Sequence, residues 1–417
     1  MTALDPEALG VRACAMIAEL ATISAEPNRL VRLFLTPEHR RAADLVATWM
    51  QAAGLSVSED ALGTLRGRFG NANRRLLIGS HIDTVIDAGK YDGPLGVIAG
   101  ILAAEPFARA KANLSFGLDV LAFGDEEGSR FPATVTSSSA CAGVFEQEAL
   151  ALADADGVTL AAAMRAYGKD PRDIPAAAYR PQDAAAYLEV HIEQGPVLEA
   201  KGEPLGVVTG IVGQTRLRVT VTGEAGHAGT VPMNLRRDAY AGAAEMALAL
   251  EAIAREHPED GMVGTVGRIE ASPGAVNIIP GRVAFTVDLR ALTDALRAAA
   301  VERFAAEARR IAQARGLKVA VETFHEIATA HCAPALQDLL ADCVGDLGHT
   351  PIRLPSGAGH DAQVMARLCP SAMLFVRCRG GISHNPAEFA SVSDMGVAIA
   401  ALIRFIERFQ PDEAAIG

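Results

Sequence analysis

The fold of this chain is indicated by residues 75–123, which read RLLIGSHIDTVIDAGKYDGPLGVIAGILAAEPFARAKANLSFGLDVLAF. Two apolar runs, Arg75–Ser80 and Gly117–Phe123, have the length of buried strands, and polar residues follow each of them. A helical pattern over Gly93–Ala110 lies between the two runs. Strand, helix and strand in this order are typical of an α/β sheet, whose sites lie at the carboxyl ends of the strands.

The pattern changes after about residue 213. The segment predicts strands and helices in the order β-α-β-β-α-β, which is the ferredoxin-like unit. The expected elements are strand Gln214–Thr222, helix Arg237–Glu256, strands Met262–Glu270 and Gly281–Arg290, helix Thr293–Arg315 and strand Leu317–Thr323. Candidate catalytic and metal-binding residues occur on both sides of this segment, so we interpret the segment as an insertion. The expected division is 1–212 and 328–417 for an α/β domain with a central mixed sheet, and 213–327 for the inserted α+β domain.

Composition excludes several classes of protein. Of 417 residues, 50% are apolar and 21% charged, and the formal net charge is -12 without a Lys/Arg cluster. Nucleic acids and acidic membranes are therefore not expected as partners. We find neither a secretory signal pattern nor an apolar run of about 18 residues, and the six cysteines form no CxxC pair. These features favour reduced, buried thiols and a cytoplasmic location.

Polar residues with metal-binding and proton-transfer chemistry follow the first two strands. His81 and Asp83 stand two residues apart, so in an extended backbone the carboxylate can support the imidazole. Asp92 opens a turn at the start of a helix. Glu126 and Glu127 are adjacent and point different ways, so one can bind a metal while the other acts as a base.

Four further histidines stand in polar, mostly glycine-containing segments: His191, His227, His360 and His384. A single histidine is usually a surface or hydrogen-bonded core residue, and a single Glu-Glu pair is usually a solvated face. Several such features follow predicted strands within one α/β region, and neighbouring glycines allow the backbone to approach a site closely. This coincidence favours a functional interpretation.

Eight motifs in order make the chain similar to a known family. They are GSHIDTV, YDGPLGV, GDEEGSRF, LEVHIEQGPVLE, GEAGHAGTVPM, NIIPG with VDLR, SGAGHDA and GISHNPAE. They resemble the M20 metallopeptidase-like family, specifically its hydantoinase/carbamoylase branch of N-carbamoyl-L-amino-acid hydrolases and allantoate amidohydrolases. The resemblance implies a zinc-peptidase-like catalytic domain and an inserted lid and dimerisation domain.

The resemblance also implies a binuclear metal site. His81 and His191 would bind one ion together with Asp92, which would bridge to a second ion held by Glu127 and His384. Imidazole and carboxylate ligands suit zinc, while manganese, cobalt and nickel use the same ligand set.

The same resemblance implies roles for other residues. Glu126 would be the general base that takes a proton from water and returns it to the leaving nitrogen. Asp83 would orient His81, and His227 would stabilise the oxyanion. Arg290 would clamp the substrate carboxylate through its planar fork. The remaining candidates for substrate binding are Asn277, Gln194, Gln214, Gly359 and His360.

We therefore expect a homodimeric hydrolase that releases ammonia and carbon dioxide from allantoate or an N-carbamoyl-L-amino acid. Two alternatives are a peptidase or N-acyl-amino-acid deacylase on the same scaffold, and a non-catalytic binding protein. Peptidase relatives carry an acidic residue at the position of His191, which argues against the first. The presence of the full ligand set and of Glu126 argues against the second. Arg377 and Arg379 depart from the family pattern, and they suggest either an additional anion contact or surface arginines.

Overall fold

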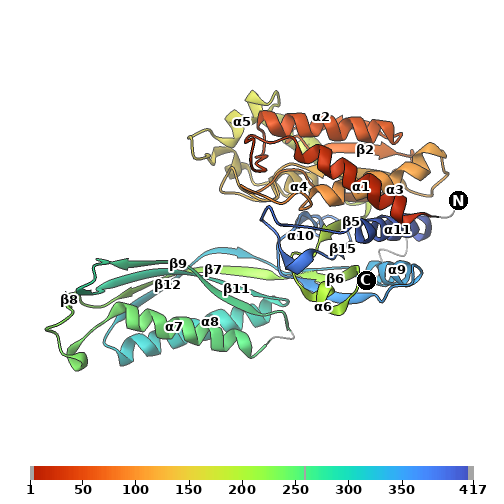
Figure 1. Cartoon of the computed structure of the whole chain (residues 1–417). Coiled ribbons are helices and arrows are strands. Elements are labelled where there is room, and N and C mark those ends of the chain that lie inside the picture. Colours follow the sequence, from red (N-terminus) through yellow and green to blue (C-terminus); the bar gives the residue numbers. More distant parts are fainter. Residues whose placement is uncertain (1–3, 258–259, 412–417) are drawn as a thin grey trace. The chain divides into compact units, whose positions relative to one another are not determined.

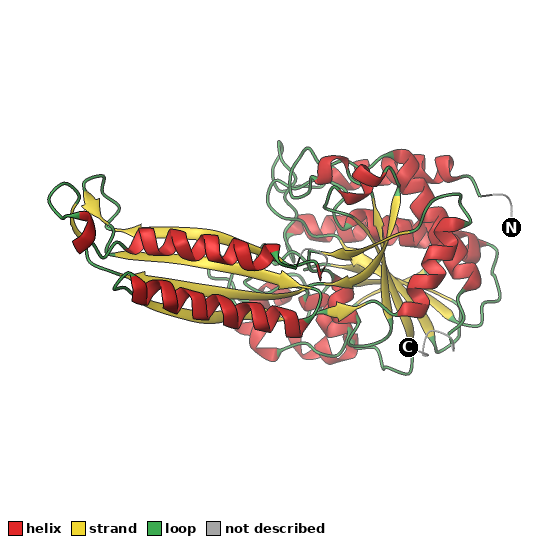
Figure 2. Cartoon of the chain, turned by 90° about the horizontal axis from the view of Figure 1, so that it is seen from below, coloured by secondary structure: helices red, strands yellow, loops and turns green. Residues whose placement is uncertain are grey.

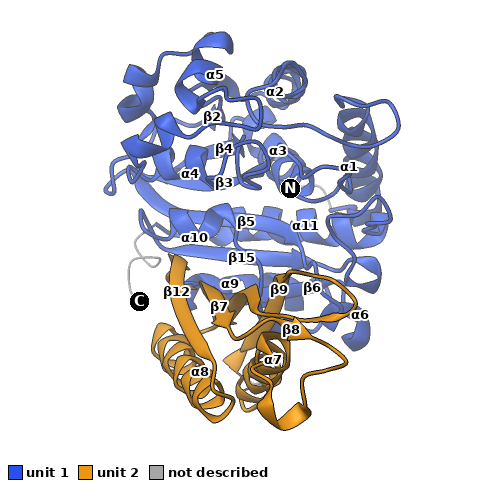
Figure 3. Cartoon of the chain, turned by 90° about the vertical axis from the view of Figure 1, so that its left-hand side faces the viewer, with its two compact units in different colours: residues 1–209, 331–417 blue, residues 210–330 orange. Residues whose placement is uncertain are grey.

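The computed structural model describes residues 4–257 and 260–411. The chain forms two compact units, shown in different colours in Figure 3. Unit 1 comprises Met1–Thr209 and His331–Gly417, and unit 2 comprises Gly210–Ala330.

Unit 1 is built around a nine-stranded mixed sheet (Figure 1). The strand order is β1-β2-β4-β3-β5-β15-β6-β13, with β14 paired to β6. The bounds are β1 Ser56–Glu59, β2 Leu65–Phe69, β3 Arg75–His81, β4 Gly117–Phe123, β5 Ala184–Ile192, β6 Leu205–Ile211, β13 Ala330–His331, β14 Ile352–Ser356 and β15 Ser371–Val376.

The middle of this sheet consists of four parallel strands, β4, β3, β5 and β15. Every residue of these strands is buried, as expected for parallel strands that are covered on both faces. Their carboxyl ends lie at one edge of the sheet. Segments that are far apart in the sequence therefore meet there.

Helices cover these strands. α3 packs on β3, β4 and β5 and against α1 and α11, while α10 packs on β3, β5 and β15 and against α4. The longer helices of unit 1 begin at capped or proline-containing first turns; Thr36, for example, accepts a hydrogen bond from the backbone of His39 at the start of α2. The bounds are α1 Pro6–Ala21, α2 Pro37–Ala52, α3 Pro94–Arg109, α4 Thr136–Cys141, α5 Leu160–Ala166, α6 Val197–Lys201, α9 Pro334–Gly345, α10 Asp361–Met365 and α11 Val392–Arg408.

Unit 2 is a four-stranded antiparallel sheet covered by two helices (Figure 2). The strand order is β12-β7-β11-β9, and the apolar residues of the sheet pack on α7 and α8 in a separate core. A short pair, β8 with β10, extends from one end. The bounds are β7 Gly213–Thr222, β8 Gly226–His227, α7 Ala239–Arg255, β9 Val263–Ser272, β10 Ile278–Ile279, β11 Arg282–Ala291, α8 Asp294–Ala314 and β12 Lys318–Ile327.

The observed elements agree closely with the patterns in the sequence. The predicted helix over Gly93–Ala110 is α3, and the two apolar runs that flank it are β3 and β4. Five of the six cysteines are buried, Cys14 is half-buried, and all six are free thiols. None of the helices in the described part of the chain has the length and apolar character needed to cross a membrane.

Candidate metal centre

The candidate site lies at the carboxyl ends of the four parallel strands of unit 1. His81 is the last residue of β3, and His191 is the second-last residue of β5. Glu126 and Glu127 follow β4, and the segment with His384 follows β15. Strand pairing thus brings together residues that are up to about 300 positions apart in the chain.

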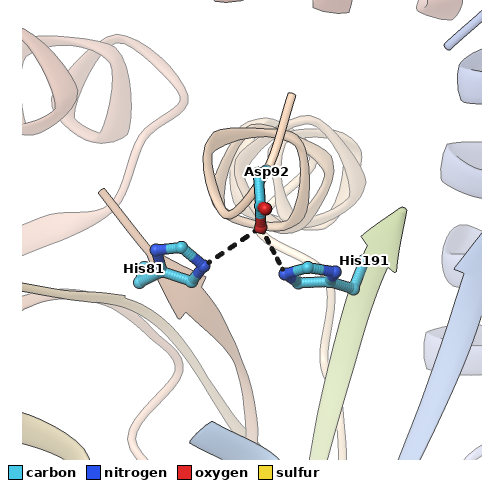
Figure 4. A group of neighbouring side chains, drawn as sticks. All are labelled: His81, Asp92 and His191. Carbon is cyan, nitrogen blue, oxygen red and sulfur yellow. Dashed lines mark ion pairs between the residues drawn. The ribbon is translucent and has the colours of Figure 1, made fainter. Parts of the chain in front are cut away.

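A first group of candidate ligands consists of His81, Asp92 and His191 (Figure 4). Oδ1 of Asp92 lies 3.6 Å from Nε2 of His81 and 3.1 Å from Nε2 of His191. All three residues are buried, and neither Nε2 atom has a hydrogen-bond partner. Two unpartnered buried ring nitrogens that face one carboxylate oxygen form a donor set suited to a cation.

A second group consists of Asp92, Glu127 and His384. Nε2 of His384 lies 3.3 Å from Oδ2 of Asp92 and 3.5 Å from Oε2 of Glu127. Asp92 therefore presents one oxygen to each group. A carboxylate in this position can bridge two cations, and the donors fit the two divalent ions that the family resemblance implies.

The local backbone explains how Asp92 reaches this position. Gly93 caps α3 with φ 81°, in the left-handed region that favours glycine. A Cβ atom on Gly93 would lie 2.5 Å from the ring of His81. The missing side chain therefore allows the turn to pass directly over the imidazole, and Pro94 then begins the helix.

The acidic groups of the site are crowded. Burial, followed by the charge of Asp92, raises the pKa of Glu127 to about 7. Burial also raises the pKa of Glu126 well above its usual value, with Glu127 adding to the rise and His81 opposing it. Burial opposes ionisation of Asp92 as well, but the nearby imidazoles of His191, His384 and His81 favour its charged form and hold its pKa well below the usual value. Bound cations would relieve the repulsion among these carboxylates.

Asp83 connects the strand that carries His81 to the segment that carries the two glutamates. Its Oδ1 lies 3.3 Å from Nδ1 of His81. Its two oxygens also accept hydrogen bonds from the backbone N–H groups of Glu126 (3.2 Å) and Glu127 (3.3 Å). One buried carboxylate therefore holds both the imidazole and the backbone of the glutamates.

The substrate-binding candidates of unit 1 have partners of their own. Gln194 donates from Nε2 to Oδ2 of Asp92 at 2.8 Å. His360 follows Gly359, is buried, and shares a 2.8 Å hydrogen bond with Ser356. The ring of His360 lies 4.5 Å from that of His191, and its Nδ1 lies 4.0 Å from Oε1 of Glu126, so both candidates lie next to the candidate ligands.

The candidates of unit 2 form two groups. His227 pairs with Ile278 across β8 and β10, so it lies beside Asn277, and both residues are exposed. Gln214 pairs with Arg290 across β7 and β11, and both side chains bond to Asp288. The guanidinium of Arg290 thus lies against one carboxylate of the chain itself, and its role as a substrate clamp stays a prediction.

The two arginines that follow β15, Arg377 and Arg379, each contact another residue of unit 1. Arg377 makes two hydrogen bonds of 2.9 Å to Asp394 in the first turn of α11. Arg379 lies over the ring of Phe389, 4.6 Å from its centroid. Arg377 therefore has a structural partner, and this favours the interpretation that does not involve an anion contact.

Sequence reasoning missed Ser383, Glu388 and Glu189. Each is close in sequence to a candidate histidine ligand and lies inside one of the motifs, Glu189 in LEVHIEQGPVLE and Ser383 and Glu388 in GISHNPAE. The available signal was the position of a polar side chain one to four residues from a histidine ligand. That signal is weak because it does not say which way the side chain points.

Comparison with known proteins places the chain in a family. The model of peptidase family M20/M25/M40 matches residues 77–408. The chain belongs to this family. It is 41% identical to an N-carbamoyl-L-amino acid amidohydrolase of Geobacillus stearothermophilus over 94% of this chain and 97% of that protein. It is also 41% identical to an allantoate deiminase of Arabidopsis thaliana over 95% of this chain and 81% of that protein.

A solved structure of a related protein has the same fold. It is an amidase of the hydantoinase/carbamoylase family from Burkholderia multivorans, with 33% sequence identity, a TM-score of 0.89 and coverage of 97% of this chain and 98% of that one. This chain is therefore an M20-family hydrolase of the hydantoinase/carbamoylase branch, as its motifs indicated.

Proposed function

We propose that this M20-family hydrolase is a binuclear metal-dependent amidohydrolase that removes the N-carbamoyl group from allantoate or an N-carbamoyl-L-amino acid. The observation that carries the proposal is the position of Asp92, whose two oxygens face two separate ligand groups. The names of the relatives support the substrate class. The six free thiols support a cytoplasmic location for the activity.

His81, Asp92 and His191 would hold one divalent ion, and Asp92, Glu127 and His384 would hold the other. Zinc is the first expectation, with manganese, cobalt and nickel as alternatives. When bound, such ions polarise a carbonyl group and make water acidic.

Glu126 is the residue that moves the proton. It is adjacent to Glu127 in sequence, its backbone is held by Asp83, and its raised pKa suits a group that first accepts and then donates a proton. The water oxygen forms a bond to the carbamoyl carbon while Glu126 takes a proton from that water. The bond from this carbon to the substrate nitrogen then breaks, and Glu126 returns the proton to that nitrogen. The carbamate released decomposes to ammonia and carbon dioxide.

Residues of unit 2 would bind the substrate. His227 would donate to the developing oxyanion, and Arg290 would bind the carboxylate at two points. Asn277 and Gln214 are their respective neighbours.

The spacing within unit 2 supports a homodimer. Gln214 and Thr222 lie eight residues apart near the two ends of β7, so they are roughly 26 Å apart, and His227 follows Thr222 in the sequence on the separate strand β8. A small ureido acid cannot reach both Arg290 and His227 of the same unit. We infer that one of these groups acts in the active site of a second subunit.

Mixed dimers test this inference. Glu126→Gln subunits and His227→Ala subunits are each expected to be inactive alone. If His227 acts across the dimer, mixing the two variants restores one intact site in each heterodimer. Each heterodimer then has up to half of the activity of a wild-type dimer. If the mixture stays inactive although heterodimers form, His227 acts within its own subunit.

Ammonia release tests the activity itself. The purified protein, stripped with a chelator and reloaded with zinc or manganese, should hydrolyse allantoate or an N-carbamoyl-L-amino acid. N-carbamoyl-β-alanine tests the range of ureido acids, and N-acetyl amino acids and dipeptides are the controls. Activity only on the controls would support the peptidase or deacylase alternative. Full activity without metal would contradict the metal-dependent mechanism, and inactivity on all substrates would favour the binding-protein alternative.

A further inference from the structure

Glu388 is a buried carboxylate that contacts the loop of Asp92 from a distant part of the chain. Glu388 lies between His384 and α11 in the sequence, and the residue is 4% exposed. Oε1 accepts hydrogen bonds from the backbone N–H groups of Tyr91 at 2.8 Å and Asp92 at 3.1 Å. The carboxylate thus holds the peptide backbone that carries the proposed bridging ligand.

The other oxygen of Glu388 connects to the side chain of Asp92. The hydroxyl of Ser383 lies 3.1 Å from Oε2 of Glu388 and 2.8 Å from Oδ2 of Asp92. Gln194 donates from Nε2 to the same Oδ2 at 2.8 Å and to the hydroxyl of Ser383 at 3.1 Å. Asp92 is therefore fixed at its backbone by Glu388 and at one carboxylate oxygen by Ser383 and Gln194.

The packing around Glu388 shows that the loop is built on this carboxylate. A Cβ atom on Gly89 would lie 2.2 Å from Cδ of Glu388. The bare backbone at Gly89 therefore allows the loop to pass directly over the carboxyl group. A side chain at this position would displace either the carboxyl group of Glu388 or the loop itself.

We propose that Glu388 is a positioning residue that sets the orientation of Asp92, with Ser383 as its connection to the carboxylate. The inference rests on the proposed metal centre. Oδ2 is held on the side of His384, and this leaves Oδ1 directed at His81 and His191. Loss of this support lets the carboxylate rotate, so neither cation keeps its shared ligand in place.

The variants separate this role from a general contribution to folding. Glu388→Gln retains an oxygen for the two backbone N–H groups and an amide that can donate to Ser383, so it should bind metal within threefold of the wild type. Glu388→Ala removes all these contacts, and Ser383→Ala removes only the connection to the carboxylate. We expect metal affinity to fall about 10- to 100-fold for Glu388→Ala and by a smaller factor for Ser383→Ala.

The measurement is competition for zinc between the stripped protein and a chromophoric chelator, with thermal unfolding of the stripped protein as a second readout. Glu105→Ala is the matched control, because Glu105 is a buried carboxylate in the last part of α3 that pairs with Arg109 of the same helix and with Arg12 of α1. It should lower the melting temperature and leave zinc affinity unchanged.

The outcomes distinguish the two proposals. If the wild type binds zinc and both Glu388→Ala and Ser383→Ala bind it equally well, the positioning role is wrong while the metal centre stands. If Glu388→Ala does not fold, the affinity of Ser383→Ala decides. If the wild type binds no divalent ion, the proposed metal centre itself fails.

Discussion

The carboxylate of Asp83 lies 3.3 Å from Nδ1 of His81 and also holds the backbone of the glutamate segment. Two strand ends thus depend on one buried side chain.

Asp83→Asn keeps the size of the side chain but removes one acceptor oxygen and the negative charge. We expect a 10- to 100-fold loss in metal affinity or in kcat. Asp87→Asn, on the same loop, is the control, and equal affinity and kcat in both variants would contradict the role of Asp83.

Replacement of Glu126 by glutamine should separate metal binding from turnover. The amide cannot accept a proton, so we expect kcat to fall by about 10²- to 10⁴-fold. The ligand groups are unchanged, so metal content measured by atomic emission should stay at the wild-type value. Retention of wild-type turnover would exclude Glu126 as the base.

Arg290→Ala tests the proposed carboxylate clamp. It removes a planar donor from the end of β11, and we expect the KM for ureido carboxylates to rise by about tenfold or more, since charge-assisted hydrogen bonds contribute about 1.5–3 kcal/mol each. Arg218→Ala is the matched control, because Arg218 lies on β7 of the same sheet and contacts the ring of Phe324. A similar KM in both variants would place the carboxylate of the substrate elsewhere.

Protonation of His39 should contribute to acid sensitivity. His39 is fully buried, and this burial lowers its pKa from 6.5 to about 4. The folded state therefore binds fewer protons than the unfolded state between these values, so stability is highest above pH 6.5 and falls as the pH drops toward 4. The contribution of His39 to the free energy of unfolding reaches about 3 kcal/mol. The charged groups that act on the ring are Asp83, Arg32, Glu59 and Arg40.

Urea unfolding of the chelator-treated protein at several pH values measures this effect. His39→Gln lacks the titrating ring, so its stability should fall less steeply than that of the wild type between pH 6.5 and 4.5. Identical slopes for the two proteins would show that His39 does not titrate on unfolding in this range.

Much of the fold could be predicted because its signals are local. The run Gly117–Phe123 is a strand at the predicted residues, and the long elements of unit 2 follow the predicted order, to which the structure adds the short strands β8 and β10. The strand over Ala184–Ile192 was not anticipated, since its alanine-rich first half has no clear period. Segments without a hydrophobic period, such as the loop that carries Glu388, depend on contacts with distant parts of the chain for their structure.

The amino-acid sequence by itself determined the order of the elements and supplied the chemical groups of the candidate site, His81, Asp92, Glu127, His191 and His384. Residue type and local periodicity depend on neighbours along the chain, so they can be read without coordinates. Only the tertiary structure decided that β4, β3, β5 and β15 lie side by side in parallel, that the two oxygens of Asp92 face different histidines, and that Glu388 accepts hydrogen bonds from the backbone of Tyr91 and Asp92. These relationships depend on pairing and packing between distant segments, and no local pattern encodes them.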